Sequence, residues 1–205
     1  TFNDIARYKV LLHFLIARLF FNDGLITIFA FGGIYAMDTL GFSIYENFIL
    51  GIVLTFSAGV GSLFFGYLED RIGVKRVINI SLWVLILSTM MAYFAPETNY
   101  SKEIFWIAGT LIGLMVGPNQ SCSRSLMARL TPKDKQNEFF GFFAFSGKIT
   151  AFLGPFLLAQ VTLFSLSYLK LSNELAQRAG ISVVLILIII GSILLHFVDE
   201  ENKPQ

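Results

Sequence analysis

Gly66-Tyr67-Leu68-Glu69-Asp70-Arg71-Ile72-Gly73-Val74-Lys75-Arg76 is a short charged stretch between two long apolar runs, 47–68 and 77–95. Each run is long enough to cross a bilayer as a helix, because roughly 20 apolar residues span about 30 Å of hydrocarbon. Its basic side chains place the stretch on the cytoplasmic side of a membrane. Gly66 and Gly73 suit a tight reversal of the chain. The stretch therefore predicts two membrane helices joined by a cytoplasmic turn.

The composition indicates an integral membrane protein. Hydrophobic residues make up 55% of the chain and charged residues only 14%, whereas soluble domains have about 25% charged residues. With a net charge of +1 and no basic tail, we expect no nucleic-acid partner. Cys122 is the single cysteine, which excludes an internal disulfide framework and a multi-cysteine metal site. We expect no cofactor and no metal.

Hydropathy divides the chain into six expected membrane spans. They lie near residues 11–36, 47–67, 77–95, 104–126, 139–163 and 181–198. The connections between them are short, which leaves no room for a soluble domain. The sequence therefore predicts an all-α membrane protein in which residues 1–205 form one transmembrane domain. The chain opens at Thr1 without a signal-peptide pattern, so we expect it to be a piece of a longer polypeptide.

Basic residues give the expected orientation of these spans. With both termini cytoplasmic, ten basic residues fall on the cytoplasmic side and three on the other side. The ten are Arg7, Lys9, Arg71, Lys75, Arg76, Arg124, Arg129, Lys133, Lys135 and Lys203, and the three are Lys102, Lys170 and Arg178. Arg18 and Lys148 fall within spans.

Polar and charged residues concentrate in the first, fourth and fifth spans, while the third and sixth are almost wholly apolar. A charge at the centre of a membrane helix costs about 2.5–3.5 kcal/mol on insertion scales, so such residues normally face a cavity or a partner. The candidates for a transport cavity are Arg18, Asn22, Asp23, Asn119, Gln120 and Lys148.

Each charge in this set has an alternative interpretation. Arg18 either faces the cavity or extends to the cytoplasmic headgroups. Asp23 lies deeper and has either a role in transport or gating or a structural role as the ion-pair partner of Lys148. It is the only acidic residue well inside a span, which makes it the candidate for proton coupling. Desolvation and the charge of Lys148 would act on its carboxyl group in opposite directions.

The pattern Gly-x-Leu-x-Asp-Arg-x-Gly-x-Lys-Arg at 66–76 resembles the loop signature of the major facilitator superfamily. In that superfamily the signature joins the second and third helices of each six-helix half. The resemblance implies a half built as a 3+3 inverted repeat, whose first and fourth helices line the central cavity. It also implies a cytoplasmic gate formed by Gly66, Asp70, Arg71, Gly73, Lys75 and Arg76.

Further stretches are similar to the vacuolar-effluxer-like family, the autophagy-related amino-acid effluxers of that superfamily. They are 18–25, 31–36, 120–125, 138–148 and 153–155. The family has about twelve helices, so this chain corresponds to the C-terminal six. The resemblance implies the missing N-terminal half, membrane lipid and a small-molecule solute as partners. It also implies a bacterial inner membrane or a vacuole-like membrane as the location.

Two classes of function are consistent with the sequence. The first is a secondary active transporter, with this chain as half of a permease that moves a small polar solute, possibly amino acids, by alternating access. The second is a non-transporting membrane module, such as a receptor or assembly subunit on the same half-fold. An enzyme is not expected, because the chain has no His-Glu-x-x-His pattern, no paired membrane aspartates and no nucleophile beside a base. An ATP-driven pump is not expected either, because there is no phosphate-binding loop.

Overall fold

The computed structural model describes residues 8–198, with the side chains of residues 149 and 150 left aside. In this part of the chain every regular element is helical, as the sequence predicts. The elements are α2 (Lys9–Asp38), α3 (Ile44–Ile72), α4 (Val74–Phe94), η1 (Ala95–Glu97), α5 (Ser101–Leu130), η2 (Lys133–Lys135), α6 (Gln136–Ile149), η3 (Thr150–Phe152), α7 (Leu153–Ser167) and α8 (Asn173–His196).

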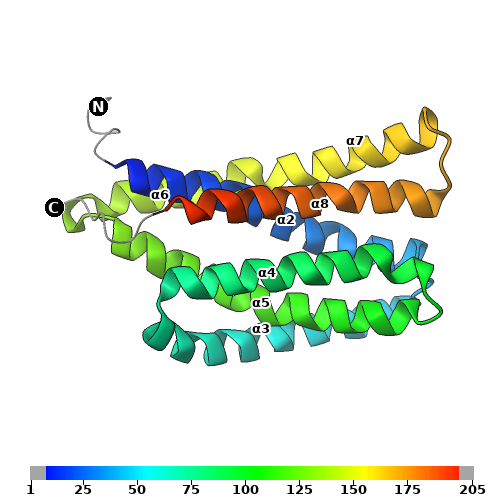
Figure 1. Cartoon of the computed structure of the whole chain (residues 1–205), viewed down its shortest axis with the longest axis horizontal. Helices are drawn as coiled ribbons and strands as arrows, with labels where there is room; N and C mark the ends of the chain where they lie inside the picture. The colour runs from blue at the N-terminus through cyan, green and yellow to red at the C-terminus, as the bar shows by residue number, and fades with distance from the viewer. Residues whose placement is uncertain (1–7, 199–205) are drawn as a thin grey trace.

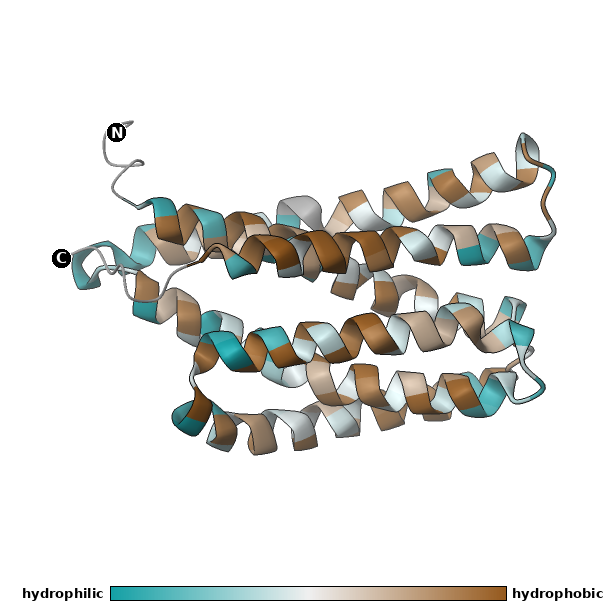
Figure 2. Ribbon diagram, in the orientation of Figure 1, coloured by the Kyte–Doolittle hydropathy of each residue, from teal (hydrophilic) through white to brown (hydrophobic). Residues whose placement is uncertain are grey.

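Five helical segments are long and apolar enough to cross a membrane. They are Lys9–Asp38, Ile44–Ile72, Val74–Glu97, Lys133–Ser167 and Asn173–His196. Figure 2 shows that their middle turns are mainly hydrophobic and that hydrophilic residues gather at the two ends of the bundle. The chain is therefore an integral multi-pass membrane protein. The remaining long helix, α5, has 30 residues and is more polar than the other five.

The helices lie roughly along a common axis and pack as two groups of three (Figure 1). In one group, α5 packs against α3 and α4. In the other, α2 packs against α7 and α8. Contacts between α4 and α8 join the groups, and α2 also touches α5 and α6. The start of α2, the end of α8 and the junction of α3 with α4 lie at one end of the bundle (Figure 1).

Gly73 alone makes the reversal between α3 and α4. Its φ of 91° and ψ of 150° define a backbone conformation that residues other than glycine rarely adopt. Its N–H donates to the carbonyl oxygen of Glu69 at 2.9 Å and so ends α3. Gly66 lies inside α3, so the expectation that it forms part of the turn is wrong. The helical hydrogen bonds of α3 continue to Ile72.

Small residues bring the backbones of neighbouring helices together at two seams. A Cβ atom on Gly113 of α5 would lie 2.6 Å from the carbonyl oxygen of Leu54 of α3. A Cβ on Gly191 of α8 would lie 2.7 Å from the Cβ of Phe21 of α2. In a bilayer the hydrophobic effect does not drive helices together, because lipid is as apolar as the side chains, so close van der Waals packing of this kind must hold them in contact. These two seams fix α5 on α3 and α8 on α2.

The two glycines of the charged stretch should respond in opposite ways to alanine. Gly73→Ala should lower the free energy of unfolding by about 1–3 kcal/mol, because alanine is strained at this backbone conformation. Gly66→Ala is the matched control. It adds a methyl group where no atom lies within 4 Å, and alanine favours a helix interior by up to about 1 kcal/mol. Thermal unfolding of the full polypeptide in detergent measures both, and equal effects would contradict this reading of the turn.

Candidate functional site

The side chains of α2 and α5 meet through one hydrogen bond at the middle of the bundle. Gln120 Nε2 donates to Asn22 Oδ1 at 2.8 Å. Asn22 is 4% exposed, and Gln120 is half-buried. Arg18 and Asp23 lie within a turn and a half of Asn22 on α2. We call Arg18, Asn22, Asp23 and Gln120 the polar cluster.

Arg18 is held by α6 and does not extend to the bundle end. Its side chain is 6% exposed, and its Cζ lies 3.6 Å from the centre of the Phe143 ring. Nη1 donates to the carbonyl oxygen of Phe143 at 3.2 Å. Sequence reasoning did not find this role of Phe143, because the contact joins residues 125 positions apart.

Asp23 is sealed within the bundle, with the backbone N–H of Gly154 as a polar neighbour. It is 0% exposed, and neither carboxylate oxygen has a hydrogen-bond partner among the described residues. The carboxylate lies against the first turn of α7, since a Cβ on Gly154 would be 3.2 Å from Asp23 Cγ. A buried carboxyl group is costly in a membrane helix and normally faces a cavity or a partner.

Lys148 does not pair with Asp23 in the structure. It is exposed on α6, and no ion pair or hydrogen bond of Lys148 is found within residues 8–198. Asp23 is covered by the helices of this chain, whereas Lys148 points out of them. The expected coupling of the two charges stays a prediction.

Asn119 belongs to the packing between α5 and α4. It is fully buried, and its Nδ2 donates to Ser81 Oγ at 2.9 Å. Ser81 in turn donates to the carbonyl oxygen of Ile78 at 2.7 Å. Asn119 and Gln120 are adjacent in sequence but point to different helices, so the structure does not bring Asn119 into the polar cluster.

The charged stretch 66–76 makes contacts that the sequence did not indicate. Glu69, in the last turn of α3, accepts from the thiol of Cys122 at 3.3 Å and pairs with Arg129 at 3.4 Å. Lys75 donates to the carbonyl oxygens of His196 and Val198, at 3.1 and 2.5 Å, at the end of α8. Glu69 therefore ties α3 to α5, and Lys75 ties α4 to α8.

The other charged residues expected to form the gate, Asp70, Arg71 and Arg76, are exposed on the surface of the protein. Arg71 stacks on the ring of Tyr67, at 4.6 Å from its centre, and donates to its hydroxyl. Asp70 and Arg76 are exposed and make no ion pair within the described part of the chain. The structure thus does not join Asp70 to Arg71 within this chain.

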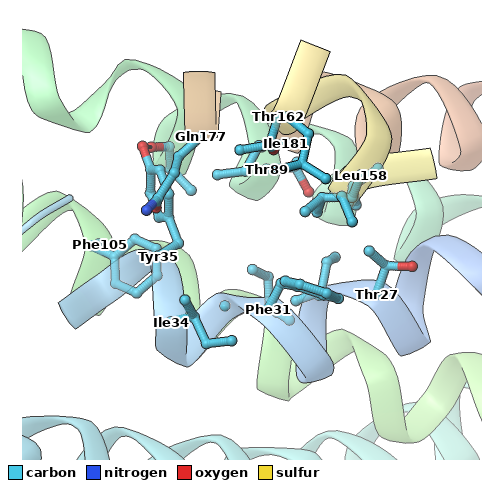
Figure 3. Close-up of a pocket in the computed structure, with 17 residues that line it drawn as sticks. Thr27, Phe31, Ile34, Tyr35, Thr89, Phe105, Leu158, Thr162, Gln177 and Ile181 are labelled. Carbon is cyan, nitrogen blue, oxygen red and sulfur yellow. Dashed lines mark hydrogen bonds between the residues drawn. The ribbon is translucent and has the colours of Figure 1, made fainter. Parts of the chain in front are cut away.

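A pocket of about 350 Å³ lies further along α2, between α2, α7, α8 and the ends of α4 and α5. Figure 3 shows Tyr35 and Gln177 on one side of it and Thr27 and Leu158 on the other. Its lining is mainly apolar, with Thr89 and Thr162 among the few polar groups. No residue of the polar cluster lines it. The sequence did not indicate this pocket, because its lining comes from five helices.

A bundle of membrane-spanning helices whose inner helices carry polar and charged side chains defines the class of multi-pass α-helical membrane proteins. Comparison with known proteins identifies the family. The sequence profile described as "Vacuole effluxer Atg22 like" matches residues 1–205, and the chain belongs to that family.

Several curated proteins are similar to this chain. It is 32% identical to the "Uncharacterized MFS-type transporter YxiO" of Bacillus subtilis, over 100% of this chain and 45% of YxiO. It is 30% identical to "Autophagy-related protein 22" of Cryptococcus neoformans, over 69% of this chain and 27% of that protein. It is 26% identical to a "Na(+), Li(+), K(+)/H(+) antiporter" of Planococcus maritimus, over 92% of this chain and 42% of the antiporter. The chain spans less than half the length of these relatives.

The hydrogen bond between Asn22 and Gln120 should contribute measurably to stability. A double-mutant cycle of Asn22→Ala and Gln120→Ala should give a coupling energy of about 0.5–1.5 kcal/mol, the range for hydrogen bonds between membrane helices. Ser121→Ala is the control, since Ser121 bonds only to its own helix, at the carbonyl oxygen of Pro118. Its effect should add to that of Asn22→Ala. Unfolding in detergent measures all variants, and additive effects of Asn22 and Gln120 would contradict the bond.

Proposed function

We propose that this chain is the C-terminal six-helix half of a secondary active transporter that moves a small polar solute, with amino acids as candidates, by alternating access. The polar cluster carries the proposal. It lies on α2 and α5, which would be the first helix of each three-helix repeat, and it includes a sealed carboxyl group without a partner. A membrane module with a purely structural role gains nothing from such a group.

The pairing of the helices supports a 3+3 inverted repeat, with α2, α3 and α4 as the first repeat and α5, α6–α7 and α8 as the second. The first helix of each repeat packs on the second and third helices of the other repeat. Thus α2 contacts α7 and α8, and α5 contacts α3 and α4. In this arrangement α5 would be the sixth membrane crossing. Its 30 residues reach about 45 Å at 1.5 Å per residue.

Asp23 is the proposed coupling residue. A carboxyl group in an apolar site can be neutral or charged according to what it faces, so its protonation can change between the two orientations of a transporter. One relative is named as an antiporter that exchanges monovalent cations for protons, which supports proton coupling in related chains. Lys148, exposed in this half, would then face the N-terminal half or the solute.

The cytoplasmic gate is proposed at the junction of α3 and α4. Glu69 and Lys75 hold this junction to α5 and α8, so it moves with this half as one body. Asp70, Arg71 and Arg76 are exposed there and are available to the N-terminal half. Gly66 and Gly73 belong to the same motif, and Gly73 provides its reversal.

Transport by the full-length protein in proteoliposomes tests the proposal. Uptake of each common amino acid is measured with and without an imposed pH gradient. Asp23→Asn should abolish the stimulation by the pH gradient, because the side chain no longer binds or releases a proton. Exchange of labelled for unlabelled solute should persist within about threefold of wild type.

Asp134→Asn is the matched control for this experiment. Asp134 is exposed in the short helix η2 at the cytoplasmic end, so its loss should leave the pH stimulation unchanged. Loss of exchange together with loss of folding in Asp23→Asn would assign Asp23 a structural role. A correctly folded wild-type protein that transports none of these solutes, with or without a pH gradient, would favour the non-transporting membrane module.

A further inference from the structure

One edge of the Arg18 guanidinium has no hydrogen-bond partner within residues 8–198. The guanidinium has five N–H groups in a planar fork, and Nη1 uses one of them on the Phe143 carbonyl oxygen. Nε is buried without a hydrogen-bond partner. Nη2 also makes no hydrogen bond to any described residue. The free edge, Nε and Nη2, is one that can bind a carboxylate or phosphate through two parallel hydrogen bonds.

No acidic group neutralises this edge. The ion pairs of the described residues join Lys102 to Glu46, Arg129 to Glu69, and Arg178 to Glu97 and Glu174. The nearest acidic residue along α2, Asp23, is unpaired as well. Arg124, one turn beyond Gln120 on α5, adds a second positive charge that acts on Arg18. A buried cation without a counter-ion is strongly destabilising, so this position favours an anion.

The groups beside the free edge are also hydrogen-bond donors. Asn22 accepts from Gln120 through Oδ1, which leaves Nδ2 as the group that it offers to a ligand. Gly147 of α6 lies directly beside the guanidinium. A Cβ there would be only 3.2 Å from Arg18 Nη1, which is tight, and at ordinary contact distance from Nη2 and Asn22 Nδ2, at 3.6 and 3.8 Å. A larger residue at this position would therefore press on the guanidinium.

We propose that Arg18, Asn22 and Gly147 form a subsite for an anionic oxygen group of the solute, a carboxylate or a phosphate. The Nε–Nη2 edge binds two oxygens of this group, Asn22 Nδ2 donates to it, and the face of Phe143 holds the guanidinium plane in place. Gly147 places no side chain against the fork. The inference rests on the proposed function, because a solute must reach this position from the membrane surface. Within the chain, the carboxylate of Asp23 is the group that could compete with the solute for the Nε–Nη2 edge of Arg18.

Binding of small anions to the purified full-length protein tests the subsite without transport. Acetate, inorganic phosphate and the neutral isostere acetamide are titrated at constant ionic strength, and the thermal midpoint of unfolding is followed. Acetate or phosphate should raise the midpoint saturably, and acetamide should not. The anion that acts identifies the group as carboxylate or phosphate. The absence of a saturable shift with both anions would overturn the proposal.

Two variants locate the effect. Arg18→Lys keeps the charge but loses the fork, and should weaken anion binding at least tenfold. Gly147→Ala leaves Arg18 in place and fills the space above it, and should weaken binding severalfold in a folded helix. Gly141→Ala is its control on the same helix, because no atom lies within 4 Å of the added methyl group. Unchanged affinity in Gly147→Ala, or in a folded Arg18→Lys, would overturn the proposal.

The outcome is separable from that of the proposed function. Anion binding that depends on Arg18 would stand even if no amino acid is transported. Conversely, uptake of a neutral solute by a protein that binds no anion would support the proposed transport function and contradict the anion subsite.

Discussion

The close contact of helix backbones at glycine residues is the constraint on which the rest of the structure depends. Lipid is as apolar as the side chains that face it, so burial alone does not hold membrane helices together, and close packing must do so. Gly113 lets α5 reach the backbone of α3, and Gly191 lets α8 reach that of α2. These contacts set the rotation of α2 and α5. Rotation decides which side chains face each other inside the bundle.

Once α2 and α5 are fixed in this way, their polar side chains divide between two uses. Asn119 donates to Ser81 and stabilises the packing of α5 on α4, although its own Oδ1 has no hydrogen-bond partner among the described residues. Asn22 and Gln120 share one hydrogen bond across the middle of the bundle. Within residues 8–198, Arg18 Nε and the carboxylate oxygens of Asp23 also have no hydrogen-bond partner, although both residues are buried where an unsatisfied charge is most costly. The proposed solute and proton sites are built on these two charged groups.

The charged stretch shows how far a motif can be interpreted. Its residue types place it at the cytoplasmic end and indicate a reversal, and a reversal is found at Gly73. The motif does not tell which glycine turns, because both are small and only the hydrogen bonds of α3 distinguish them. Nor does it single out Glu69, whose partners Cys122 and Arg129 lie on α5, more than 50 residues away. A motif carries local backbone preferences, and its contacts depend on what packs beside it.

The sequence by itself determined the membrane class, the all-helical fold and the concentration of polar residues in particular helices. These follow from hydropathy over about 20 residues and from the cost of charge in hydrocarbon, and both are local. Only the tertiary structure decided the partner of each polar side chain. Arg18 meets Phe143, Asp23 lies against Gly154 at the start of α7, and Asn119 turns toward α4. These outcomes depend on helix rotations set by glycine contacts between distant segments, which no single stretch of sequence contains.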